Sequence, residues 1–263
     1  MDIVNQYQQE DACISWSGGK DSAYACYLAM RQGLNVRFLA SMMTANNSRL
    51  FPHYLTPEIM QAQSKAIGIP LIQQWVTVPA KVSRDKTRVT DYDVKFTEML
   101  QGLRIDGVTR GVFGVVSVGN PFFEQQRSWV DEVCRPAEVR PYLPLWGMDR
   151  ESIIRNIVAE GFKAIVVMCD NHRLGKEYLG RVLDEDLLSE FIERHRSAPD
   201  GKVGLYLTFV LDGPIFNKRL DIDESVDIKL NDMWYLDIKR FHLVDKSTNE
   251  SCKLLREEEL VFV

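Results

Sequence analysis

The amino-acid sequence predicts an α/β fold, in which a parallel sheet is followed by a second, smaller α+β domain. Strand-like and helix-like runs alternate through the first two-thirds of the 263 residues, a pattern typical of right-handed βαβ units. One of these runs, Gly111–Val118, is almost continuously apolar, as expected of a parallel strand buried on both faces. From Gly204 onward the pattern becomes rich in strands. We therefore expect two domains, residues 1–145 and residues 146–263, that meet near Pro141–Pro144.

The first predicted elements form a strand–helix–strand unit. Ala12–Trp16 is a short apolar run, and Ser22–Arg31 follows it with residues that favour a helix ending before Gly33. Val36–Met42 is the second strand candidate. The next helix starts at Thr56–Glu58, where a capping residue, a proline and an acidic residue follow one another. This unit leaves a short loop between its first strand and its first helix.

The helix that starts at Thr56 is expected to run to Ala66 and to end near Gly68. The later elements of the first domain are, in order, the strand Pro70–Val78, the helix Asp91–Leu103, the strand Gly111–Val118, the helix Glu124–Cys134 and the strand Val139–Leu143. In the second domain, Asp149–Glu160 has the apolar stripe of an amphipathic helix, and Gly161 follows it. The remaining elements are the strand Lys163–Met168, the helix Asp184–His195 and the strands Tyr206–Leu211, Ser225–Leu230 and Met233–Leu243.

Composition and charge exclude several classes of protein. The chain has 32 Lys+Arg and 37 Asp+Glu, and its net charge of −5 argues against a protein that coats nucleic acid. No apolar run is long enough to span a bilayer, and the amino end does not resemble a signal peptide. The five cysteines form no CxxC motif, so neither a zinc site nor a disulfide framework is indicated. We therefore expect a cytoplasmic protein without a membrane partner, and the sequence carries no signal of an oligomeric state.

One loop carries a chemical signature. Ser17–Ser22, with the sequence SGGKDS, lies between the first strand and the first helix. Gly18 and Gly19 let the backbone turn tightly and approach an anion, and a helix N-terminus offers unpaired N–H groups and a positive dipole end. Lys20 adds a positive charge, and the two serines add hydroxyl groups. The segment predicts a pyrophosphate cradle without Walker A spacing; the alternative is a surface turn rich in Gly and Ser.

Asp21 is the residue of this loop that does not suit a phosphate by itself. A carboxylate beside phosphate oxygens becomes favourable when a cation bridges them, and Mg²⁺ is commonly held by one or two carboxylates together with substrate phosphates. We therefore expect Asp21 to be a ligand of Mg²⁺. Lys20 and Asp21 are the residues for which we expect a catalytic role, and the whole loop is expected to hold a pyrophosphate group.

The loop resembles the SGGKDS signature of the PP-loop ATP pyrophosphatases, which cleave ATP between the α and β phosphates. Within this group the chain resembles the diphthine–ammonia ligase family most, because further segments match that family. These segments are Ser41-Met42, His53, Thr56-Pro57, Gln63, Gly68–Pro70, Pro144–Trp146, Leu179–Arg181 and Thr208–Phe216. The resemblance implies a HUP-type (Rossmann-like) nucleotide-binding domain, with a second domain that completes the substrate site. It also implies an ATP-dependent ligase that adenylates a substrate carboxylate, after which ammonia or an amine displaces AMP.

The same resemblance implies further site residues. Ser41 and His53 are expected to contact the nucleotide, and Arg181, Thr208 and Asp212 to contact the substrate. Plainer alternatives exist for three of them. A lone histidine is often structural, Arg181 can equally be a surface arginine, and Asp212 can equally belong to a turn between strands.

Two segments depart from the family. Its members carry Gly-Glu-x-Gly-Glu-Phe/Tyr-x-Thr before the last motif, and here Lys202 and Leu205 stand in place of the two glutamates. Because negative charge is replaced, we expect a neutral or anionic acceptor rather than the cationic trimethylammonium group of diphthine. The family's Arg-Val/Ile-Glu element is also changed, to Trp129–Asp131.

Two other functions are weighed against the ligase. PP-loop enzymes that modify tRNA or transfer sulfur can use reactive cysteines, but Cys13 and Cys26 lie in apolar runs that favour a place in the core. Lys202 and Lys218 form no basic stripe interleaved with aromatic residues, so a nucleic-acid partner is not expected. A nucleotide-binding module without catalysis is favoured by the replaced glutamates and disfavoured by the complete loop.

Overall fold

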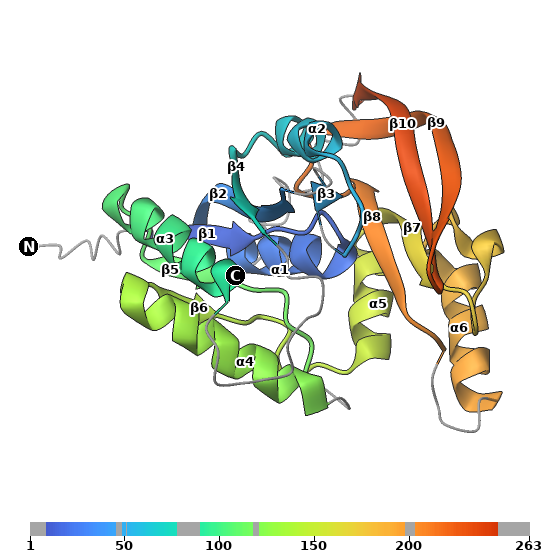
Figure 1. The fold of residues 1–263 in the computed structure, drawn as a ribbon, viewed down its shortest axis with the longest axis horizontal. Helices are drawn as coiled ribbons and strands as arrows, with labels where there is room; N and C mark the ends of the chain where they lie inside the picture. Colours follow the sequence, from blue (N-terminus) through green and yellow to red (C-terminus); the bar gives the residue numbers. More distant parts are fainter. Residues whose placement is uncertain are drawn as a thin grey trace, which may run out of the picture.

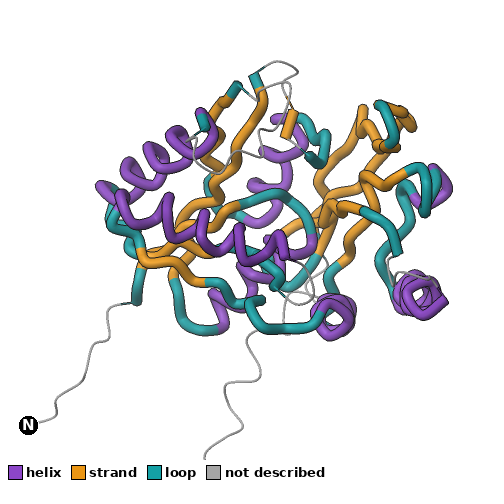
Figure 2. Tube along the Cα trace, turned by 60° about the horizontal axis from the view of Figure 1, so that its bottom comes forward, coloured by secondary structure: helices purple, strands orange, loops and turns teal. Residues whose placement is uncertain are grey.

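The computed structural model of the chain describes residues 9–45, 49–50, 52–77, 90–117, 121–197 and 203–246, with backbone only at residues 121–123. These residues form two β-sheets that lie beside each other, with helices packed against them (Figure 1 and Figure 2). The strand–helix alternation and the strand-rich end are both present, which confirms the predicted α/β fold class. Within the described ranges, no helix combines the length and the apolar character needed to cross a membrane.

The first sheet has parallel strands in the order β4–β2–β1–β5–β6, and β3 pairs antiparallel with the end of β2. Its elements and those packed on it are β1 (Asp11–Ser15), α1 (Lys20–Arg31), β2 (Asn35–Thr44), β3 (Arg49–Leu50), α2 (Pro57–Ile67), β4 (Leu71–Val76), α3 (Asp91–Ile105), β5 (Arg110–Val112), α4 (Pro121–Cys134), the one-turn helix η1 (Arg135–Ala137) and β6 (Arg140–Tyr142). Successive side chains of a strand point to opposite faces. Ile14 of β1 accordingly joins the core formed with α1 and α2, whereas Cys13 joins the core formed with α3 and α4.

β1 lies where the order of the strands reverses. The chain proceeds from β1 to β2 and β4 on one side, and then crosses to β5 and β6 on the other side. In open α/β sheets, ligands bind outside the carboxyl ends of the strands at such a point. The segment Ser17–Ser22 follows β1 directly, so the topology places it at this position.

The second sheet is antiparallel, with the order β8–β7–β10–β9. Its elements and those packed on it are α5 (Arg150–Ala159), β7 (Lys163–Asp170), the one-turn helix η2 (Lys176–Tyr178), α6 (Glu185–Ser197), β8 (Tyr206–Asp212), β9 (Lys218–Leu230) and β10 (Met233–Asp245). A single hydrophobic core joins the two sheets, because Ile14 and Met60 share it with Ile165 and Phe209. The division into domains at residues 145 and 146 stays a prediction.

Three strands differ from those predicted. The strand expected at Gly111–Val118 is limited to Arg110–Val112, because Gly114 lies against the first turn of α1, where an added Cβ would be 2.7 Å from the Asp21 carbonyl oxygen. β9 begins at Lys218 instead of Ser225, because Leu220 and Ile222 alternate with charged residues and contact the core, a short apolar pattern that the prediction missed. β3 was not predicted, because two residues are too few to give a pattern.

Candidate functional site

The loop Ser17–Ser22 turns sharply into α1. Gly18 adopts a left-handed conformation with φ of 75°, and α1 begins at Lys20 with Gly19 as a cap residue that provides no side-chain hydrogen bond. Two contacts with β8 hold the loop: the Lys20 amide donates to Thr208 Oγ1 at 3.1 Å, and the Val210 amide donates to the Gly18 carbonyl at 2.9 Å. The helix N-terminus, which attracts anions, is therefore fixed by a strand of the second sheet.

The two serines of the loop hydrogen-bond to each other and to the loop backbone. Ser22 Oγ donates to the Gly19 carbonyl at 3.0 Å, and the Ser17 and Ser22 hydroxyls are 3.1 Å apart. The Gly19 amide donates to Ser17 Oγ at 3.3 Å. These bonds set the shape of the loop, so the serines preorganise it as well as offering hydroxyl groups to a ligand.

Neither glycine of the loop leaves room for a side chain. A Cβ on Gly18 would lie 2.8 Å from Gln63 Oε1, and a Cβ on Gly19 would lie 2.9 Å from the Thr208 carbonyl oxygen and 3.1 Å from His53 Nε2. The positive φ of Gly18 adds backbone strain for any other residue. Glycine is thus required by close packing of α2, β8 and His53 around the loop.

Lys20 and Asp21 form an ion pair at the edge of the loop. Lys20 Nζ is 2.8 Å from Asp21 Oδ2 and lies over the Tyr206 ring, 5.5 Å from its centroid. Burial disfavours the charged form of Lys20, but Asp21 outweighs it and the pKa of Lys20 is raised. Arg150, at the start of α5, acts electrostatically on both Lys20 and Tyr206. The loop therefore presents a lysine that is charged at neutral pH, with a further cation nearby.

His53 packs against Gly19 from the turn that follows β3. Its side chain is buried, and its Nδ1 has no hydrogen-bond partner among the described residues. Burial lowers the pKa of His53 to about 4; Asp21 opposes this shift, and Lys20 adds to it. A neutral imidazole with an unpaired nitrogen thus lies at the N-terminus of α1, where a phosphate group or the nucleotide could supply the missing partner.

Gln63 was predicted only as part of the family resemblance, and the structure gives it a central role in holding the site together. It is fully buried, accepts from Trp16 Nε1 at 2.9 Å, and donates through Nε2 to the Gly18 carbonyl at 3.0 Å and the Val210 carbonyl at 2.7 Å. One side chain therefore links the end of β1, the loop and β8. A polar residue on the apolar face of α2 is the signal that could have found it.

The other predicted site residues fall into two groups. Thr208 lies at the loop, and Ser41 is close to it, donating from Oγ to the Trp16 carbonyl at the end of β1. Asp212 and Arg181 contact neither the loop nor each other. Asp212 pairs with Lys246 and accepts from the Gly213 amide, about 13 Å along an extended strand from Thr208. Arg181 pairs with Glu190 at 2.7 Å.

The positions that depart from the family are partly visible. Lys202 lies outside the described residues. Leu205 precedes Tyr206, and its side chain is 51% exposed, while its amide donates to the buried Asp170 carboxylate at 2.6 Å. An exposed leucine therefore directly precedes, in the chain, the tyrosine whose ring contacts Lys20.

A magnesium ion at this site would depend on the nucleotide. The described residues contain no group of three or more His, Cys, Asp or Glu side chains that could hold a metal. Asp21 is a partly exposed carboxylate at the loop, and Mg²⁺ accepts one or two carboxylates with phosphate oxygens and water as its other ligands. A single carboxylate of this kind fits a magnesium ion that would arrive with phosphate groups as its other ligands.

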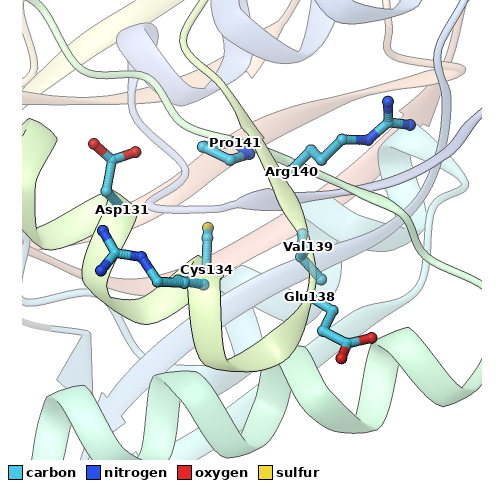
Figure 3. A pocket seen from close by; sticks show the side chains of 7 residues that line it. Asp131, Cys134, Glu138, Val139, Arg140 and Pro141 are labelled. Atoms are coloured by element: carbon cyan, nitrogen blue, oxygen red, sulfur yellow. The ribbon is translucent and has the colours of Figure 1, made fainter.

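The cysteines and the described pocket lie elsewhere. Burial raises the pKa of both Cys13 and Cys26 to about 12, so their thiols stay protonated at neutral pH. A pocket of about 330 Å³ is lined by Asp131, Cys134 and Arg140, among others (Figure 3). It lies at the beginning of β6, whereas the loop follows the end of the parallel strand β1. Neither feature contributes to the loop.

Comparisons with known proteins cover most of the chain. A family described as “Diphthamide synthase N-terminal domain” matches residues 11–141, and one described as “Diphthamide synthase C-terminal domain” matches residues 149–244. The Homo sapiens protein named “Diphthine–ammonia ligase” is 26% identical in an alignment of 245 positions, and the match covers 88% of this chain and 91% of that protein. The Danio rerio protein of that name is 25% identical, over 88% of this chain and 95% of its own. The Schizosaccharomyces pombe protein is 27% identical, over 85% of this chain and 38% of its own.

Proposed function

This chain belongs to the diphthamide synthase family, and from that premise we propose that it is an ATP-dependent ligase that forms AMP and pyrophosphate. It adenylates a substrate carboxylate, which ammonia or an amine then converts to an amide. The observation that carries the proposal is the complete loop Ser17–Ser22 at the N-terminus of α1, braced by β8 at the strand-order switch. The relatives named diphthine–ammonia ligase support the same reaction class.

The residues of the loop have distinct tasks in this proposal. The positive end of the α1 dipole attracts the phosphates, and the charged Lys20 binds phosphate oxygens and stabilises the charge of the departing pyrophosphate. His53, being neutral, can donate a hydrogen bond to the nucleotide without adding charge. Ser41 supports the end of β1, and Thr208 holds the first amide of α1. Arg181 and Asp212 remain proposed substrate residues that would need to act at a distance from the loop.

Asp21 is the residue that would hold Mg²⁺, and the ion when bound would supply positive charge that neutralises the phosphates. Asp21 is suited to this because its carboxylate is partly exposed beside the loop. ATP and Mg²⁺ are therefore proposed to bind together, with a carboxylate-bearing acceptor and ammonia as the other reactants.

The alternatives gain less support from the site. Sulfur transfer needs a thiolate, and burial keeps the thiols of Cys13 and Cys26 protonated. The complete loop, with its charged lysine beside a partly exposed carboxylate, disfavours a binding module without catalysis. We therefore favour the ligase over both.

The first test identifies the bond that is broken. With ATP, Mg²⁺, ammonium and a set of carboxylate acceptors, the protein is expected to release AMP and pyrophosphate, because a PP-loop places the α–β bridge at the reacting position. Chromatography of the nucleotides, with a phosphate and pyrophosphate assay, measures this. ADP as the main product would contradict the proposal.

A second test concerns the acceptor. We expect no amidation of elongation factor that carries diphthine, since Leu205 offers no carboxylate to the trimethylammonium group and both Lys20 and Arg150 would repel it. ATP binding, measured by calorimetry in the same samples, is expected to be intact. The human relative serves as the positive control for the assay. Efficient amidation by this chain would show that the glutamates replaced here are dispensable.

A further inference from the structure

A buried ion pair joins β3 to the second sheet. Arg49 approaches Asp237 of β10 with two nitrogens, Nη1 at 2.9 Å from Oδ1 and Nη2 at 3.3 Å from Oδ2. The Asp237 side chain is only 2% exposed and also accepts from Lys239 Nζ at 2.5 Å. Two parallel hydrogen bonds from one guanidinium fix its orientation as well as its distance. β3 is thereby tied to a strand that the chain reaches almost 190 residues later.

The same arginine holds the turn that follows β3. Arg49 Nη1 donates to the Tyr54 carbonyl at 3.3 Å, and its guanidinium lies 4.6 Å from the centroid of the Tyr54 ring. Tyr54 packs on Tyr235 of β10, with ring centroids 5.1 Å apart. The turn is closed by bonds from the Leu50 amide to the Leu55 carbonyl and from the Tyr54 amide to the Leu50 carbonyl. Tyr54 is therefore held by the second sheet in two ways, through Tyr235 directly and through Arg49, which pairs with Asp237.

His53 is carried by this turn. Its Nδ1 has no hydrogen-bond partner in the described part of the chain, so no such bond at that nitrogen fixes the ring. Nε2 nevertheless lies within 3.1 Å of the point where a Cβ of Gly19 would be. The position of the ring beside the loop must then depend on the backbone of the turn and on packing. Tyr54 has φ of 63°, a conformation that tyrosine rarely adopts without support from its surroundings.

We propose that Arg49 and Asp237 are positioning residues, which set the place of His53 beside the phosphate loop and couple the second sheet to nucleotide binding. This inference rests on the proposed function only in taking the loop as a nucleotide site. It assigns to the second sheet a role beyond completing the substrate site. A displacement of β10 would move Arg49 and the turn, and would thereby shift His53 relative to Gly19. An acceptor that moves β10 would in this way alter how the loop holds ATP.

The test uses the full chain and two readouts. The variants are Asp237→Asn and Arg49→Lys. The Arg49→Lys variant keeps the positive charge but cannot form two parallel hydrogen bonds with one carboxylate. Asp221→Asn is the matched control, because it removes a carboxylate from an exposed pair with Arg219 in the same hairpin. The first readout is NMR titration of the His53 ring, assigned by loss of its signal in His53→Gln among the four histidines of the chain. The second is kcat and KM for ATP in AMP formation.

We expect the pKa of His53 to be about 4 in the wild-type protein and the control. In both variants it should move toward the ordinary value of about 6.5, as the ring loosens and gains water near Asp21 and Lys20. A misplacement of about 1 Å can cost about 10²-fold in rate, so kcat/KM for ATP should fall by up to about that factor. If the pair acts through His53, adding His53→Gln to Asp237→Asn should cause no further loss.

The outcomes separate this inference from the proposed function. An unchanged His53 pKa in both variants, or losses of kcat/KM that multiply in the double variant, would overturn the positioning role. If Asp237→Asn does not fold, Arg49→Lys decides alone. If the wild-type protein forms no AMP with any acceptor, the proposed function fails, whereas the titration still decides whether the pair positions His53.

Discussion

Lys20→Ala is expected to fold as the wild-type protein does and to lose AMP formation by about 10²- to 10³-fold, the usual cost of removing one preorganised charge-stabilising group. The lysine lies in a loop at the start of α1, and its ammonium pairs with Asp21 and lies over Tyr206 rather than within a core. Its pKa is raised, because Asp21 outweighs the effect of burial, so the missing charge is one that the wild-type protein carries at every physiological pH.

The rate of AMP formation at saturating ATP tests the expected loss of activity, and the melting temperature tests whether the variant folds as the wild-type protein does. Lys95→Ala is the matched control, since Lys95 pairs with Glu98 on the surface of α3 and should leave both quantities unchanged. A Lys20→Ala protein that turns over at the wild-type rate would remove the loop from the active site. A protein that loses activity only because it melts earlier would assign Lys20 a structural role instead.

The sequence was sufficient for the features that depend on local pattern. Strand, loop and helix follow one another within Ala12–Arg31, so glycines, a charged residue and the start of an apolar helix could be interpreted together. The same holds for the cap at Thr56, which accepts from the Ile59 amide, and for the glycine at residue 68, which has φ of 86°. Each of these is decided by neighbours in the chain, which is why the fold class was predicted correctly.

Contacts between distant residues could not be predicted in this way. The bond from the Lys20 amide to Thr208 spans 188 residues, and the pair of Arg49 and Asp237 spans the same separation. Neither has a signature in spacing, because only folding brings the partners together. Arg181 and Asp212 show the reverse problem. Both lie in segments that match the family, but in the structure they pair with Glu190 and Lys246 rather than with the loop, so their role as substrate residues stays a prediction.

Gln63→Leu is expected to lower the free energy of unfolding by about 2–5 kcal/mol, since a buried polar group left without a partner costs about 1–3 kcal/mol. Leucine has nearly the volume of glutamine but cannot accept from Trp16 Nε1 or donate to the Gly18 and Val210 carbonyls. The Gly18 carbonyl keeps its hydrogen bond from the Val210 amide. The largest part of the lost stability should therefore come from the Trp16 N–H, which is left without its acceptor. For a chain of this size the melting temperature should fall by about 4–20 °C.

Gln61→Leu is the control that isolates the cause. Gln61 lies on the same helix, is half-buried, and hydrogen-bonds to the half-buried Gln73 of β4, so its loss should cost under about 1.5 kcal/mol. Because Gln63 also sets the position of Gly18, the Gln63 variant should bind ATP more weakly than the Gln61 variant at a temperature where both are folded. Denaturant unfolding and calorimetric titration of ATP measure the two effects. Equal stability and equal affinity in the two variants would mean that β1, the loop and β8 hold together without this side chain.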